Sequence, residues 1–106
     1  MSADPQLELG DCRERIDKLD VQLLELLNRR TEIVERIGRI KQELQLAIYE
    51  PKREDQVFAN VVSHNGGPLS HEAVKRIFER IIDEMRTVQQ VKMLEKSDPG
   101  RPQEPC

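Results

Sequence analysis

The chain is poor in aromatic residues and in residues that break helices. Aromatics make up 3% of the 106 residues, Trp is absent, and there are five Gly and six Pro. The prolines lie at the ends and at two joints, and no stretch alternates convincingly with a period of two. Sheets prefer aromatic and β-branched residues in such alternation. The composition therefore favours an all-helical architecture.

Cysteine and histidine are also scarce, with two of each. Cys12 and Cys106, one near each end, have neither metal-ligand spacing nor a disulfide-rich pattern. We expect Cys12 to be a packed thiol and Cys106 to lie in a tail. His64 and His71 flank one joint, and no credible nucleophile and base pair is found. We therefore expect neither covalent catalysis nor a metal site.

Two further absences concern the environment and partners of the chain. No apolar run approaches the length of a membrane span, and residues 1–5 contain neither an apolar signal core nor a twin-Arg motif. Seventeen Lys and Arg are outnumbered by twenty Asp and Glu, for a net charge of −3. Nucleic acids require a large positive field. We expect a cytoplasmic protein that binds neither nucleic acid nor membrane, with any basic site local.

Three helical segments are predicted within one domain. The first begins with Asp4 as N-cap before Pro5 and continues to about Leu46. The second begins at Glu50-Pro51 and ends at the turn 65–68, and the third begins after Ser70 and fades near residue 95. Residues 1–95 therefore form the helical domain, and residues 96–106 a polar, disordered tail.

The first segment carries a long apolar seam with a cation set into it. Arg30 falls among side chains spaced alternately by three and four, the pattern of one buried helix face: Ile16, Leu19, Leu23, Leu26, Ile33, Ile37, Ile40 and Leu44. A guanidinium there requires a carboxylate or a ligand anion. At ~1.5 Å per residue the helix spans roughly 60 Å, against a radius of gyration near ~13 Å for a compact chain. We therefore expect an intertwined homodimer.

Other polar residues interrupt the apolar stripes. Lys41 lies about three turns beyond Arg30 on the same side, whereas Arg13, ~25 Å before Arg30, reaches that region only from a partner chain. Six polar residues together predict one cationic pocket, suited to a small dianion that carries a hydroxyl. They are Arg30, Lys41, Arg53, Glu54, Gln89 and the partner's Arg13.

Each of these residues also has a structural interpretation. Arg30 can pair with a core carboxylate, Lys41 can extend to solvent, and Arg13 can form exposed surface pairs. Glu54 can cap its own helix or pair within it, and Gln89 can be an interhelical hydrogen bonder. A binding site is favoured because it explains all of them together.

The order and spacing of these residues resemble those of the all-helical chorismate mutases, the type II fold. The resemblance covers about Leu7 to Val91. It rests on Arg13 to Asp20, Leu23 to Arg30, Gly38 to Lys41, Arg53-Glu54 and Gln89-Gln90. It implies a dimer of three-helix chains that converts chorismate to prephenate in phenylalanine and tyrosine biosynthesis, without a cofactor. Association with another enzyme of the shikimate pathway is a possible further interaction.

The resemblance also implies roles for individual positions. Lys41 and Gln89 face the ether oxygen of the breaking bond, while Arg30 and the partner's Arg13 hold carboxylates. The remaining positions are as follows: Glu54 takes the ring hydroxyl, Arg53 adds a cation, Glu50 is an acid that bonds the hydroxyl or Lys41, and Met85 stands where some relatives carry a small hydroxyl residue, so that contact is expected to be absent.

Two other functions remain open. Isochorismate pyruvate lyases share the fold, a similar cationic pocket and pericyclic chemistry, although Arg53-Glu54 favours the mutase. A non-catalytic helical dimer, acting as an interaction or regulatory module, is the alternative outside enzymes.

Overall fold

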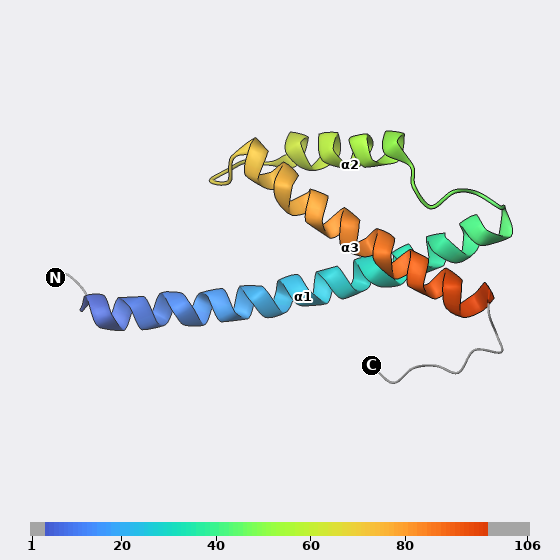
Figure 1. Cartoon of the computed structure of the whole chain (residues 1–106). Coiled ribbons are helices and arrows are strands. Elements are labelled where there is room, and N and C mark those ends of the chain that lie inside the picture. Colours follow the sequence, from blue (N-terminus) through green and yellow to red (C-terminus); the bar gives the residue numbers. More distant parts are fainter. Residues whose placement is uncertain (1–3, 98–106) are drawn as a thin grey trace. The chain divides into compact units, whose positions relative to one another are not determined.

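A computed structural model describes residues 4–97 of the chain and side chains as far as residue 92. Within that range the elements are three α-helices, α1 (Pro5–Glu43), α2 (Pro51–His64) and α3 (His71–Ser97), so the predicted helical class is confirmed (Figure 1). None of these helices is long and apolar enough to cross a membrane. The chain divides into two units, residues 1–32 and 33–106, which are described separately.

The first unit is the N-terminal part of α1. Oδ1 of Asp4 accepts a hydrogen bond from the backbone N–H of Gln6 at 3.0 Å, so Asp4 caps the helix as predicted. Asp11 and Arg15 form an ion pair one turn apart at 3.0 Å. Cys12 between them is exposed, and the prediction of a packed thiol is wrong for the single chain.

The apolar seam is not buried within one chain. Its leucine and isoleucine side chains from Ile16 to Leu44 are between 41% and 63% exposed. The buried position on α1 is Gly38, which lies outside that seam, and Val34 one turn earlier is half-buried. One chain therefore leaves uncovered the stripe that the sequence predicts to be buried.

The end of α1 differs from the prediction by three residues, at Glu43 instead of Leu46. Gln45 adopts a left-handed conformation with φ of 57°. The N–H of Leu46 donates to the carbonyl of Lys41 at 2.7 Å, and that of Gln45 to the carbonyl of Gln42 at 3.2 Å. This pair of bonds is a Schellman motif, which normally uses Gly at the left-handed position. Because Gln stands there, no residue type marks the end of the helix.

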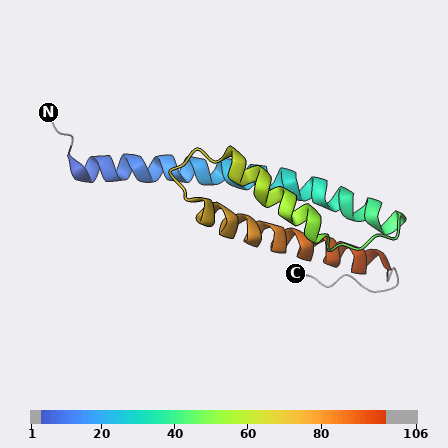
Figure 2. The ribbon, with the colours of Figure 1, turned by 90° about the horizontal axis from the view of Figure 1, so that it is seen from above.

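In the second unit, α2 packs against α3. α3 crosses the C-terminal part of α1 in the view of Figure 1 and runs beside it in the view of Figure 2. Among the α3 side chains described, those of residues 71–92, the buried apolar ones are Val74, Ile82 and Met85, all on the predicted stripe. Ser70 caps α3, because its Oγ accepts the N–H of Ala73 at 3.1 Å.

The remaining boundaries lie close to those predicted. Pro51 begins α2 and Asn65 follows its last residue, as expected from the proline and the turn at 65–68. α3 continues to Ser97, two residues beyond the predicted end. The rest of the predicted tail, including Cys106, lies outside the described residues.

Candidate active site

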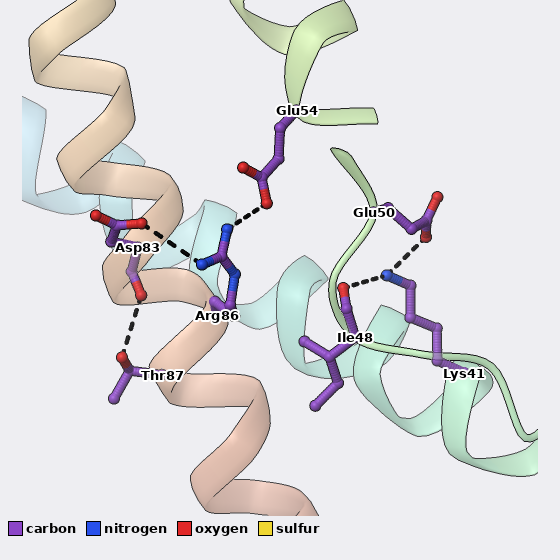
Figure 3. Close-up of polar contacts among 7 residues, drawn as sticks. All are labelled: Lys41, Ile48, Glu50, Glu54, Asp83, Arg86 and Thr87. Atoms are coloured by element: carbon purple, nitrogen blue, oxygen red, sulfur yellow. Dashed lines mark hydrogen bonds and ion pairs between the residues drawn. The ribbon is translucent and has the colours of Figure 1, made fainter. Parts of the chain in front are cut away.

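Lys41 lies in the last turn of α1, where the chain reverses. The Schellman motif turns the connector between α1 and α2, residues 44–50, back toward this turn. Lys41 Nζ donates to the carbonyl of Ile48 in that connector at 3.0 Å. The same Nζ lies 2.6 Å from Oε1 of Glu50 (Figure 3). The Lys41 side chain is only 12% exposed, whereas that of Glu50 is 50% exposed. The ammonium is therefore held within the fold and does not extend to solvent.

Glu50 precedes α2 but does not cap it with its side chain. Its backbone is extended, as expected of a residue before proline, and no side-chain cap hydrogen bond is formed. The carboxylate is instead directed to Lys41. This agrees with one of the two contacts expected of Glu50, the one with Lys41.

Gln89 is the buried polar residue among the described side chains of α3, with 8% exposure. Its Nε2 donates to the carbonyl of Val34 in α1 at 3.0 Å. An amide carries two N–H donors, so this bond uses one and leaves a second for another acceptor. The bond also matches the alternative interpretation of Gln89 as an interhelical hydrogen bonder. A structural and a binding role are compatible in the same side chain.

Gly38 allows the close approach between α1 and Gln89. A Cβ at Gly38 would lie 3.3 Å from Cγ and 3.7 Å from Cβ of Gln89, while a Cβ at Gly10 would meet nothing within 4 Å. Gly38 therefore has a packing role that Gly10, in the first unit, lacks.

We expect Gly10→Ala and Gly38→Ala to differ in stability, although both replace a helical glycine. Gly10→Ala should raise the free energy of unfolding by roughly 0.5–1 kcal/mol, the gain in helix propensity. The free energy of unfolding of Gly38→Ala should be lower than that of Gly10→Ala by about 1 kcal/mol or more, because the methyl group presses on Gln89. Urea unfolding at one protein concentration measures both. An equal gain in the two variants would contradict the tight contact.

A second polar cluster joins α2 to α3. Oε2 of Glu54 pairs with Nη2 of Arg86, and Nη1 of Arg86 lies 3.7 Å from Oδ1 of Asp83 (Figure 3). The Arg86 guanidinium also lies over the ring of Tyr49, 4.8 Å from its centroid. Glu54 therefore pairs across helices and not within α2, contrary to its structural interpretation.

Sequence analysis missed Arg86 and Tyr49. Arg86 lies one turn after Ile82 and one turn before Gln89, at the edge of the apolar stripe of α3. Like Lys41, Arg86 is a cation beside apolar side chains, and this signal marks it in the sequence as well. Tyr49 is the single tyrosine of the chain and directly precedes Glu50-Pro51.

The other predicted site residues differ in their exposure. Arg53 is exposed, and its Nη1 lies 3.5 Å from Oε1 of Gln56. Met85 is buried in the apolar core, with 9% exposure. In the first unit, Arg30 is half-buried and Arg13 is exposed. The structure thus brings Lys41 to Glu50, and the binding roles of the other predicted residues stay predictions.

Among the described residues, a Ser and a His do lie within hydrogen-bonding distance. Ser63 Oγ is 3.3 Å from Nδ1 of His64, at the exposed end of α2. However, Oγ donates to the carbonyl of Asn60 at 2.7 Å, and His64 Nδ1 lies 2.8 Å from the same oxygen. A nitrogen that donates to a carbonyl cannot also act as base toward Ser63. Both side chains bond the backbone at the end of α2, and the pair does not form a nucleophile.

The chemistry of the site is therefore hydrogen bonding and charge. Between residues 4 and 92 no group of three or more His, Cys, Asp or Glu side chains is placed to hold a metal ion. The second unit instead offers an ammonium at Lys41, an amide at Gln89 and a carboxylate at Glu54. Such groups can orient an anionic ligand that bears a hydroxyl and stabilise negative charge on it.

Comparison with known proteins gives one family. The family model of chorismate mutase type II matches residues 12–90. A bifunctional chorismate mutase/prephenate dehydratase of Aquifex aeolicus is 38% identical over 79 residues, which is 71% of this chain. The chain spans only 22% of the length of that relative.

Solved structures agree with this comparison. Chorismate mutase (form II) of Thermus thermophilus has a TM-score of 0.77 at 30% identity, covering 78% of this chain and 94% of that one. Chorismate mutase of Helicobacter pylori, in complex with prephenate, has a TM-score of 0.76 at 32% identity, covering 82% of this chain and 94% of that one.

Proposed function

Since the chain belongs to the chorismate mutase type II family, we propose that it catalyses the cofactor-free rearrangement of chorismate to prephenate in phenylalanine and tyrosine biosynthesis. One observation carries the proposal: the family match over residues 12–90 includes every candidate site residue from Arg13 to Gln89. The structure of the Helicobacter pylori relative, which contains prephenate, supports the choice of product.

The proposed mechanism requires no proton transfer. A Claisen-type rearrangement breaks one carbon–oxygen bond and forms one carbon–carbon bond within the same molecule, so the protein accelerates it by fixing a chair-like conformer and stabilising developing charge. Arg30 and the partner's Arg13 hold the two carboxylates, with Arg53 as a further cation. Lys41 and the second N–H of Gln89 donate to the ether oxygen as negative charge grows on it. Glu54 accepts the hydrogen bond of the ring hydroxyl.

The contacts of Lys41 support its proposed role. Its ammonium is held at two points, by the Ile48 carbonyl and the Glu50 carboxylate, at 3.0 and 2.6 Å. A donor whose position is fixed before the reaction costs little reorganisation when charge develops. Because an ammonium has three N–H donors, two can hold it in place while the third is directed to substrate.

We propose that the active form is a homodimer. The seam on α1 supports this, since its side chains are 41–63% exposed in one chain. Burying one such Leu or Ile contributes about 1.5–3 kcal/mol, and an identical chain related by a two-fold axis supplies a matching surface. Several curated relatives are bifunctional, so association with another shikimate-pathway enzyme also stays a prediction, as does a cytoplasmic location.

The function is tested by incubating the purified protein with chorismate and, separately, with isochorismate. Prephenate and pyruvate are quantified against buffer and against Lys41→Ala. Prephenate from chorismate, lost in the variant, is the expected result. Pyruvate from isochorismate as the dominant product would assign the chain to the lyases. Turnover of neither substrate would leave a binding or scaffold role.

The pH dependence of the reaction should be broad through neutrality. Gln89 donates the same hydrogen bond in acid and in neutral solution, because an amide does not ionise there. In Gln89→Glu, only the protonated carboxyl donates, and its population falls about tenfold per pH unit above the pKa of that carboxyl. Activity of this variant should therefore rise as pH falls.

Measurement of kcat from mildly acidic to neutral pH checks both proteins. Gln89→Leu serves as the control, because it removes the donor without adding a titrating group. A steep loss of wild-type turnover toward neutral pH would refute the role of the amide.

A further inference from the structure

Arg86 connects three parts of the second unit. It belongs to α3, pairs with Glu54 of α2, and lies over the ring of Tyr49 in the connector between α1 and α2. The side chains of Arg86 and Glu54 are 28% and 23% exposed, which places this pair among the more buried ion pairs of the described residues. Exposed pairs such as Arg80 with Glu84, at 76% and 57%, contribute little to stability or geometry.

The geometry of the pair leaves one carboxylate oxygen for another donor. Arg86 engages Oε2 of Glu54, and no hydrogen bond to Oε1 is found among residues 4–92. A carboxylate has acceptor sites on both oxygens. Glu54 can therefore be fixed through Oε2 while Oε1 accepts from a ligand hydroxyl.

Arg86 itself is poorly suited to bind a substrate carboxylate. Its two terminal nitrogens face Glu54 and Asp83, and its Cζ lies over the Tyr49 ring, 4.8 Å from the ring centroid. Two carboxylates beside one guanidinium leave no net positive charge for a dianion. The planar guanidinium is instead well suited to orient a partner carboxylate in one plane.

We propose that Arg86 is a positioning residue that orients the Glu54 carboxylate toward the ring hydroxyl of the substrate, while the Tyr49 ring holds the plane of the guanidinium. This inference rests on the proposed function. By this inference, the enzyme selects a substrate that bears the hydroxyl through Arg86, a residue outside the predicted site.

The test compares chorismate with an analogue in which the ring hydroxyl is replaced by hydrogen. Arg86→Leu should lower kcat/KM for chorismate about tenfold, because it frees the carboxylate that bonds the hydroxyl. The same variant should leave kcat/KM for the analogue within about twofold of wild type, since the analogue makes no such bond. Arg86→Lys should recover part of the loss. In a Glu54→Gln background, Arg86→Leu should add little.

Controls separate this role from a structural one. Arg80→Leu removes an exposed arginine of the same helix and should change neither kcat/KM. Thermal unfolding of each variant reports folding, and Tyr49→Leu, which removes only the stacking ring, should give the same substrate-selective loss where Arg86→Leu does not fold.

Two results would overturn the inference: equal losses on chorismate and the analogue, or no loss on chorismate. Failure of the wild-type protein to convert chorismate would overturn the proposed function and this inference together. The wild-type assay alone distinguishes that outcome from a failure of the inference about Arg86.

Discussion

Replacement of Lys41 by methionine is expected to lower kcat for chorismate about 10²- to 10³-fold, the usual effect of removing one donor to a developing negative charge. Methionine keeps most of the chain length and removes the ammonium. The 12% exposure of Lys41 makes this charge act in a partly desolvated environment, where it is stronger than at the surface. Steady-state kinetics with chorismate measure the effect.

The stability of Lys41→Met should change far less than its activity. The variant loses a bond to the Ile48 carbonyl and a pair with Glu50, whose side chain is 50% exposed and can be hydrated. The expected cost in unfolding free energy is about 1 kcal/mol. Lys18→Met, at an exposed position of α1, is the matched control and should leave kcat unchanged. A drop in kcat that merely follows the loss of folded protein would reject the catalytic role.

The contrast between Lys41 and Arg86 indicates what the sequence could predict. Lys41 lies among apolar side chains of regular helical spacing, so periodicity marks it as a cation in an unusual place. Its contacts with Ile48 and Glu50 depend on the Schellman turn at Gln45, whose left-handed conformation no glycine announces. The sequence thus predicts that Lys41 is unusual, while the partners that fix it arise from a turn with no local signal.

Contacts between residues that lie far apart in the sequence were the hardest to predict. Glu54 and Arg86 are separated by 32 residues, and Gln89 and Val34 by 55. Helical spacing places each residue on a face but does not say which face of another helix it meets. The helices, their caps at Asp4 and Ser70 and the stripe of α3 follow from local rules, whereas these partners require the tertiary fold.

The apolar seam of α1 shows a different limit of prediction from the sequence. Its periodicity predicts a buried face, yet Ile33 and Leu44 are 60% and 63% exposed in one chain. Periodicity identifies a surface that must be covered and does not state whether the same chain covers it. A site shared between two chains can be tested by a direct experiment.

Mixing two inactive variants provides that experiment. Arg13→Ala and Arg30→Ala homodimers should each lose about 10²- to 10³-fold in kcat/KM, because each site lacks one carboxylate ligand. When equal amounts are co-refolded, about half of the dimers are heterodimers, and a site shared between chains is intact once in each. Roughly a quarter of the wild-type number of sites should therefore recover.

The control for this rescue mixes Arg30→Ala with Lys41→Ala. Both residues are proposed to serve a site from the same chain, so each site in the mixed dimer lacks one of them and no activity should return. Rescue in the Arg13 mixture and none in the Lys41 mixture places Arg13 in the partner's site. Equal behaviour of the two mixtures contradicts this, since Arg13 would then act in the site of its own chain or outside any site.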